Sequence, residues 1–183
     1  MKVLAFAATN SSQSINRQLV IAATDLYKSE LVPSAEIELL DLNHYEMPIY
    51  SIDRQNDGGI PDAAHRFFDK IGAADAMIIS YAEHNGFYTA AFKNLFDWAS
   101  RIDMRVFQDK PMIIMATSIG PNGGANVLKA AETSAPFFGA DIRGTYSLPK
   151  FNESFDQSAM FPVDPERQAE LRRTLSALVP EMA

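Results

Sequence analysis

Three segments of the chain are apolar at nearly every consecutive position, and two further segments are weaker strand candidates. The strongest are residues 3–8 ("VLAFAA"), 76–80 ("AMIIS") and 111–118 ("PMIIMATS"), and the weaker ones are residues 35–42 and 141–148. Continuous apolar runs of this length are typical of strands that are buried on both faces, as in a parallel sheet covered by helices. The pattern therefore predicts a sheet of five parallel strands.

Segments with helical spacing separate these strands. Apolar residues recur three and four positions apart over residues 16–29, 62–72, 88–102, 124–138 and 165–178, which gives each segment one apolar face. The alternation of strand and helix predicts an α/β fold, a three-layer doubly wound five-stranded parallel sheet with the flavodoxin-like order 2-1-3-4-5.

The chain length suits one such unit. With 183 residues and neither an internal repeat nor a linker, we expect a single domain over residues 1–183. Its last part, residues 149–183, would be a helix and tail to which the sequence assigns no role.

The composition narrows the chemistry. Hydrophobic residues make up 47% of the chain, charged residues 21%, and there is no cysteine. The lack of cysteine excludes disulfides, thiolate nucleophiles and cysteine-ligated metal clusters. A net charge of −7 disfavours nucleic-acid binding. No apolar run is long enough to span a membrane or to form a signal peptide, so we expect a cytoplasmic protein.

The loops after the first, third and fourth predicted strands are the expected ligand site. Open parallel sheets bind ligands at the carboxyl ends of the strands, beside the point where the strand order reverses. These loops are residues 9–16 ("TNSSQSIN"), 82–87 ("AEHNGF") and 118–124 ("SIGPNGG"). All three are rich in glycine or small polar residues, which favours a shared binding site.

The first loop opens a predicted helix and is rich in hydrogen-bond donors. A helix N-terminus carries unpaired N–H groups and a partial positive charge, which suit a phosphate, and hydroxyl groups would complete the shell. The loop contains neither a Gly-x-Gly-x-x-Gly nor a Gly-Lys-Ser/Thr motif. The alternative is a plain helix N-cap in a polar turn. The hydroxyl and amide groups belong to Thr9, Asn10, Ser11, Ser12, Ser14 and Asn16.

The second and third loops each allow two interpretations. Glu83, His84 and Asn85 could hydrogen-bond a planar polar ligand while Gly86 turns the backbone, or they could form a solvated turn. His84 could act as a general acid or base, but no other histidine is spaced to form a triad or a metal site with it. The glycines of the third loop favour close approach of a ligand ring over a simple strand-to-helix turn.

The segment over residues 82–101, "AEHNGFYTAAFKNLFDWASR", resembles the motif of the NADPH-dependent FMN reductase family. That motif reads roughly Pro-Glu-Tyr-Asn-Gly-Ser, followed by Lys-Asn-x-x-Asp-Trp-x-Ser-Arg. Residues 9–17, 41–53 and 118–124 are similar to the family's phosphate loop, the stretch after its second strand and its glycine loop. The matching positions of the long motif are Glu83, Asn85, Gly86, Lys93, Asn94, Asp97, Trp98, Ser100 and Arg101.

The resemblance implies a flavoprotein that binds FMN at the strand ends and uses NADPH or NADH. It implies that the first loop holds the phosphate and that the other two loops line the isoalloxazine ring. It also implies a homodimer or homotetramer that packs through the helix at residues 88–102. Neither a catalytic side chain nor a metal ligand is implied, because the flavin carries the chemistry. The implied FMN-binding residues are Thr9, Ser11, Ser14, Ile15, Asn16, Ala82, Glu83, His84, Asn85, Gly86, Ser118, Gly120, Gly123 and Gly124.

The expected function is an FMN-dependent NAD(P)H oxidoreductase that passes hydride through FMN to a quinone, a flavin or a similar small molecule. A flavodoxin-like electron carrier stays open as an alternative, although the first loop does not resemble the usual flavodoxin pattern. A non-enzymatic flavin-binding module also stays open, because Ser11 stands where the family's phosphate loop has arginine. The other departures are Ala8 for glycine, Ala82 for proline and His84 for tyrosine. A hydrolase using His84 is disfavoured, since no nucleophile lies in a recognisable elbow.

Overall fold

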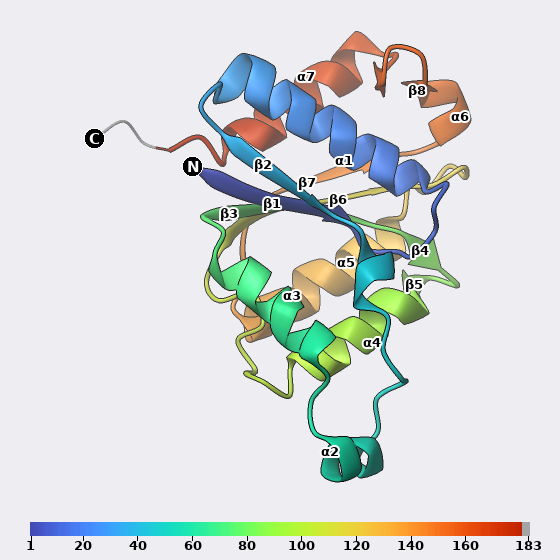
Figure 1. Ribbon diagram of the computed structural model, residues 1–183. Helices are drawn as coiled ribbons and strands as arrows, with labels where there is room; N and C mark the ends of the chain where they lie inside the picture. Colours follow the sequence, from blue (N-terminus) through green and yellow to red (C-terminus); the bar gives the residue numbers. More distant parts are fainter. Residues whose placement is uncertain (181–183) are drawn as a thin grey trace.

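The computed structural model describes residues 1–180 and contains a five-stranded parallel sheet between two layers of helices (Figure 1). The strand order is β2-β1-β3-β6-β7, so the predicted order is confirmed. The strands are β1 (Lys2–Ala7), β2 (Glu36–Leu40), β3 (Ala76–Tyr81), β6 (Pro111–Thr117) and β7 (Asp141–Leu148).

The helices divide between the two faces of the sheet (Figure 1). One face carries α1 (Ile15–Leu26), which continues into the π-helical turn η1 (Tyr27–Leu31), and α7 (Pro165–Ser176). The other face carries α3 (Asp62–Gly72), α4 (Ala90–Ala99) and α5 (Ala125–Ser134). Within residues 1–180, no helix is both long enough and apolar enough to cross a membrane.

Alternate residues of each central strand enter different cores, because successive side chains of a strand point to opposite faces. In β1, Val3 and Ala5 pack with α1 and α7, whereas Leu4 and Phe6 pack with α3 and α4. Both sets are buried. Two-sided burial is the reason that β1, β3 and β6 are continuous apolar runs in the sequence.

Several predicted helix boundaries differ from the observed ones for local reasons. The helix expected over 88–102 begins only at Ala90, because Thr89 is its N-cap and accepts a hydrogen bond from the Phe92 N–H at 3.2 Å. The helix expected over 124–138 changes at Ala135 into the 3₁₀ turn η3 (Ala135–Phe138), where Pro136 lacks the N–H that an α-helix needs. The helix predicted over 62–72 matches α3.

The pattern did not predict the short elements, which contain too few residues to show a period. They are the 3₁₀ turn η2 (Leu42–Tyr45), α2 (Ile52–Gly58), the β4–β5 hairpin (Glu83–His84 with Phe87–Tyr88), α6 (Phe151–Ser154) and the β8–β9 pair (Phe155–Asp156 with Phe161–Pro162).

An arm, residues 46–61, projects from the body of the molecule and carries α2 at its tip (Figure 1). Side chains of α4 hold its base. Asn94 accepts a hydrogen bond from the Tyr50 N–H at 2.8 Å and donates to the Pro48 carbonyl at 3.2 Å. The Trp98 indole N–H donates to the same carbonyl at 2.8 Å, and the Tyr50 ring packs edge-to-face on Trp98. The arm is therefore fixed at its base through α4.

An ion-pair cluster joins the edge strand β2 to its neighbours. Glu38 accepts from the ammonium groups of Lys70 on α3 and Lys2 on β1. The hydrogen bonds from Lys70 and then from Lys2 hold the pKa of the Glu38 carboxyl below its ordinary value of 4.5, against the opposing effect of partial burial. The ionised carboxylate is thus the form that the fold stabilises.

This cluster predicts a specific loss of stability in acid. A lowered folded-state pKa contributes stability that is fully present above pH 4.5 and is lost as the pH falls through the folded pKa. We expect Glu38→Gln to lower the melting temperature slightly at pH 7, since the pairs are partly exposed, and to flatten its decline below pH 4.5. Thermal unfolding from neutral to acidic pH measures both. Glu36→Gln, an exposed position on the same strand, is the control, and identical acid profiles for the two variants would contradict this role.

Candidate functional site

The three predicted loops meet around one cavity at the carboxyl edge of the sheet. Its volume is about 270 Å³. It is lined by Thr9, Ser11, Gln13, Ser14, Ile15, Asn16, Ala82, Glu83, His84, Thr117, Ser118 and Ile119. We call it the strand-end cavity. It brings together most of the predicted site residues, while Asn85, Gly86, Gly120, Gly123 and Gly124 are not among those that line it.

A second cavity, of about 390 Å³, adjoins the first, because His84 lines both. Its walls come from the first loop, from residues 42–49 after β2, and from the start of α4. It is lined by Asn10, Leu42, Asn43, Tyr45, Glu46, Met47, Ile49, His84, Thr89, Ala90, Ala91 and Asn94. We call it the arm cavity. Residues 41–53 resemble the family's stretch after its second strand, but no site residue was predicted among them.

The hydroxyl groups of the first loop shape the loop as acceptors. Ser14 caps α1 by accepting from the Arg17 N–H at 3.2 Å, and Thr9 accepts from the Ser11 N–H at 3.2 Å. A hydroxyl that accepts a hydrogen bond still has its own proton to donate. The N–H groups of Ile15 and Asn16 lie in the first turn of α1, where no intrahelical acceptor exists. The loop thus combines a defined shape with neutral donors.

The buried side chain of Asn16 ties this loop to two strand ends. Its Oδ1 accepts from the Ser80 hydroxyl at 2.8 Å and from the Thr117 N–H at 3.0 Å, and its Nδ2 donates to the Thr117 carbonyl at 3.2 Å. Only 3% of the residue is exposed. Asn16 therefore positions the loop against β3 and β6, a role that its predicted place in the phosphate site did not include.

Buried hydroxyl residues that were not among the predicted site residues complete this framework. Thr89 donates to the Ala8 carbonyl at 2.8 Å and so joins the start of α4 to the end of β1. Thr117 donates to the Leu148 carbonyl at 2.6 Å and joins β6 to β7. The signal was present for Ser80 and Thr117, which are hydroxyl residues within the otherwise apolar runs of β3 and β6.

The second loop is a β-hairpin with a two-residue turn. Asn85 and Gly86 both have positive φ, 53° and 81°, as a type I′ turn requires, and Asn-Gly is a preferred sequence for that turn. Glu83 reaches out of the hairpin to α5. Its carboxylate accepts from the Val127 N–H at 3.0 Å and from the Asn126 side chain at 3.2 Å.

Glu83 caps α5 from a distant part of the chain. The N-cap position of α5 is Gly124, which has no side chain with which to cap the helix. The first N–H groups of a helix need acceptors, and a negative charge near them is favourable. The carboxylate of Glu83 supplies both, and it thereby fixes the second loop against the third.

Two glycines of the third loop are required by packing. Gly123 and Gly124 have φ of 58° and 78°. A Cβ on Gly124 would lie 2.6 Å from the Cβ of Ala116, and one on Gly123 would lie 2.3 Å from the Ser147 hydroxyl. Gly120 differs, because a Cβ there would meet only the Ser118 hydroxyl at 3.9 Å. Of the three predicted glycines, Gly120 is therefore the one with open space beside it.

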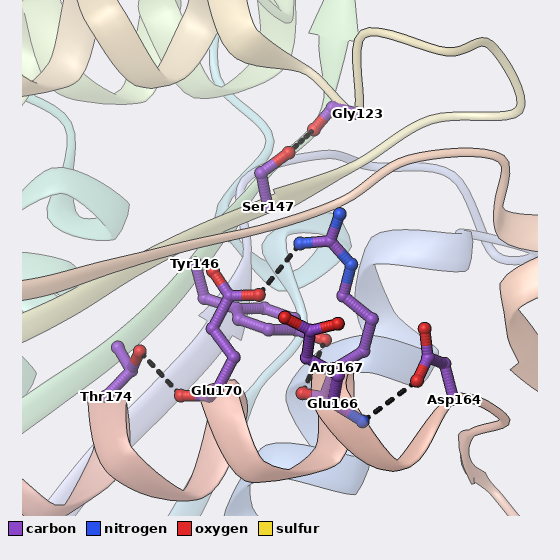
Figure 2. A network of polar contacts seen from close by, with 8 residues as sticks. All are labelled: Gly123, Tyr146, Ser147, Asp164, Glu166, Arg167, Glu170 and Thr174. Atoms are coloured by element: carbon purple, nitrogen blue, oxygen red, sulfur yellow. Dashed lines mark hydrogen bonds and ion pairs between the residues drawn. The ribbon is translucent and has the colours of Figure 1, made fainter.

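The chain after β7 braces this third loop. The backbone N–H groups of Lys150 and Phe151 donate to the carbonyls of Gly120 and Ser118, each at 2.9 Å. From β7 itself, the Ser147 hydroxyl donates to the Gly123 carbonyl at 3.0 Å, and Figure 2 shows the two groups facing each other. On the opposite face of β7, Tyr146 donates to the Arg167 carbonyl of α7 at 3.3 Å (Figure 2). The start of the C-terminal segment, which had no predicted role, thus supports the third loop through Lys150 and Phe151.

Comparisons with known proteins agree with this architecture. A family model described as NADPH-dependent FMN reductase matches residues 1–153. An NADPH:quinone oxidoreductase from Arabidopsis thaliana is 35% identical over 124 residues, which cover 68% of this chain and 61% of that protein. An NAD(P)H-dependent FMN reductase from Pseudomonas aeruginosa is 34% identical over 128 residues, covering 68% of this chain and 64% of that protein. The chain thus spans less than two thirds of the length of either relative.

Solved structures resemble the fold over nearly the whole chain. A flavoenzyme NAD(P)H:(acceptor) oxidoreductase from Paracoccus denitrificans has a TM-score of 0.76 at 23% identity, with 97% of this chain and 94% of that chain covered. An FMN-dependent NADH-azoreductase from Bacillus anthracis, in complex with FMN, has a TM-score of 0.69 at 14% identity, with 98% and 99% covered. The predicted flavodoxin-like fold is confirmed.

The remote cap predicts a local effect of substitution at Glu83. We expect Glu83→Ala to lower the free energy of unfolding by about 1–2 kcal/mol, the usual cost of losing a helix cap, and to speed hydrogen exchange at the Val127 amide. Glu83→Gln should have a smaller effect, because its carbonyl oxygen can still accept. Chemical denaturation and residue-resolved hydrogen exchange measure the two effects. Glu36→Ala is the exposed control, and unchanged exchange at Val127 in Glu83→Ala would contradict the cap.

Proposed function

The chain belongs to the NADPH-dependent FMN reductase family, and we propose from this premise that it is an FMN-dependent NAD(P)H oxidoreductase. Its acceptor would be a quinone, a flavin or a similar small molecule. The observation that carries the proposal is the convergence of three loops, from the ends of β1, β3 and β6, on one strand-end cavity. This is the place where an open α/β sheet binds its ligand.

The residues of the strand-end cavity fit FMN in their chemistry. Thr9, Ser11 and Ser14 offer hydroxyl donors beside the N-terminus of α1, a setting suited to the phosphate. The N–H groups of Ile15 and Asn16 would add to this donor set. The polar second loop and the open space at Gly120 suit a planar ring. In this proposal the phosphate lies at the first loop and the ring between the other two.

The ring would be held by backbone and side chains from two loops. The residues assigned to it are Ala82, Glu83, His84, Asn85, Gly86, Ser118, Gly120, Gly123 and Gly124. Among them, Glu83, Gly123 and Gly124 act through the shape of the loops, since the carboxylate caps α5 and the glycines permit close packing.

When bound, FMN supplies the redox chemistry by taking hydride from NAD(P)H and delivering electrons to the acceptor. The chain's own contribution is to bind and orient. The arm cavity adjoins the strand-end cavity at His84 and has room, about 390 Å³, for part of a second ligand. We assign it to the nicotinamide and the acceptor, which would occupy it in turn. Tyr45, Met47 and Ile49 offer apolar contacts there, and Asn10 offers an amide.

The test of this function combines binding with turnover. The purified protein is mixed with FMN, and NADPH absorbance is followed with and without a quinone. We expect NADPH to be consumed only when FMN is present, and the rate to rise with quinone concentration. Binding of FMN without NADPH oxidation under any acceptor would support a non-enzymatic module instead. A stable one-electron reduced flavin without NADPH oxidation would support an electron carrier.

A homodimer or homotetramer is a further part of the proposal. Ile49 and Ile52 of the arm are 74% and 52% exposed. Large apolar side chains on a projecting segment favour an interface, and Ile49 also lines the arm cavity. The arm rests on α4, the helix that the sequence resemblance assigned to subunit packing. Two other expectations, a single domain and a cytoplasmic location, stay predictions.

Light scattering after size exclusion tests the assembly. We expect a mass of twice or four times the 20.2 kDa of the chain. The double substitution Ile49→Asp and Ile52→Asp should shift the protein toward the monomer, because it would place charges in the interface. Val163→Asp, which alters another exposed apolar residue, is the control. A monomeric wild-type protein across the accessible concentrations would contradict the proposal.

A further inference from the structure

The strand-end cavity has no cationic wall. Among the described residues that line it, none is lysine or arginine. Glu83 is the one acidic residue in that lining, so the formal charge of the lining is −1 with a neutral His84. A phosphate bound there would meet hydroxyl groups, backbone N–H groups and the helix N-terminus, and no fixed positive side chain.

The one arginine in the first turn of α1, Arg17, is exposed and does not line the strand-end cavity. It lines a small pocket with Asp41, and this pocket shares Thr9 and Ser11 with the strand-end cavity. The pKa of the Asp41 carboxyl is lowered, first by the hydrogen bond from the Asn43 N–H and to a smaller degree by the charges of His44 and Arg17. Arg17 thus lies next to Asp41 at the side of the first loop, and no cation is among the described residues that line the strand-end cavity itself.

Neutral donors recognise a phosphate more weakly than a guanidinium does. Charge-assisted hydrogen bonds are roughly twice as strong as neutral ones, and an arginine can engage a phosphate through two of them. A helix N-terminus adds only a modest, salt-screened attraction. The free energy of flavin binding must then come mainly from the ring and the ribityl chain, which riboflavin and FMN share.

We propose that this site binds flavins with little preference for the phosphate, so that riboflavin and FMN are comparable ligands and the bound flavin exchanges readily. The inference rests on the proposed function, since it assumes that the strand-end cavity is a flavin site. It adds the class of flavin that the site accepts. In this proposal Ser11 determines the specificity for FMN over riboflavin. It lines both the strand-end cavity and the Arg17 pocket, and it is uncharged where the family's phosphate loop has arginine.

The experiment compares the two flavins by fluorescence titration at low and moderate salt. For the wild-type protein we expect dissociation constants within about tenfold of each other, a ratio that depends only weakly on salt. For Ser11→Arg we expect FMN to bind at least about tenfold more tightly, riboflavin to be unchanged, and the gain to shrink with salt.

Ser12→Arg is the matched control, because Ser12 is exposed and lines neither the strand-end cavity nor the Arg17 pocket. It adds the same charge one position away and should leave the ratio of the two affinities near that of the wild type. A wild-type preference for FMN of about a hundredfold or more would overturn the inference while leaving the proposed function standing. Binding of neither flavin would refute the flavin site itself. The wild-type comparison decides the matter even where a variant fails to fold.

Discussion

The buried amide of Asn16 is the interaction on which the geometry of the site depends. At the end of β6, the backbone N–H and carbonyl of Thr117 both bond to the Asn16 side chain, and buried backbone groups without partners are costly. Asn16 satisfies both and also accepts from Ser80. One side chain therefore fixes the first loop against β3 and β6. The strand-end cavity exists because these three segments are held together at one edge of the sheet.

A division of roles follows from this framework. Some polar side chains hydrogen-bond to other segments of the chain and hold loops and helices in place; they are those of Asn16, Glu83 and Thr89. Thr9 and Ser14 accept from the backbone and keep a proton for a ligand. In the family motif, Asn94 and Trp98 anchor the arm. Several residues of the motif therefore hold segments in place, and of its matching positions only Glu83 lines the strand-end cavity.

The predictability of each part follows from how many residues define it. The three central strands were predicted because they are apolar at consecutive positions, and α3 was predicted because its apolar residues repeat with helical spacing. The hairpin and the arm were not, since two to seven residues show no period. The three loops were found because strand ends follow from sheet topology. The wall contributed by residues 42–49 was missed, because its place beside His84 depends on how the arm folds back onto α4. Gly123 and Gly124 were assigned to the ligand, yet contacts with Ala116 and Ser147 also require them, which only coordinates reveal.

The remote cap on α5 has a consequence for how this region can change over evolution or by design. Position 124 must remain glycine for its φ of 78° and its contact with Ala116, so it cannot acquire a capping side chain of its own. The capping group has to come from another segment, and Glu83 of the hairpin provides it. The two loops are therefore coupled. A design that grafts the glycine loop onto another sheet must include the carboxylate of the hairpin, and a substitution in either loop restricts the residues that the other can accept.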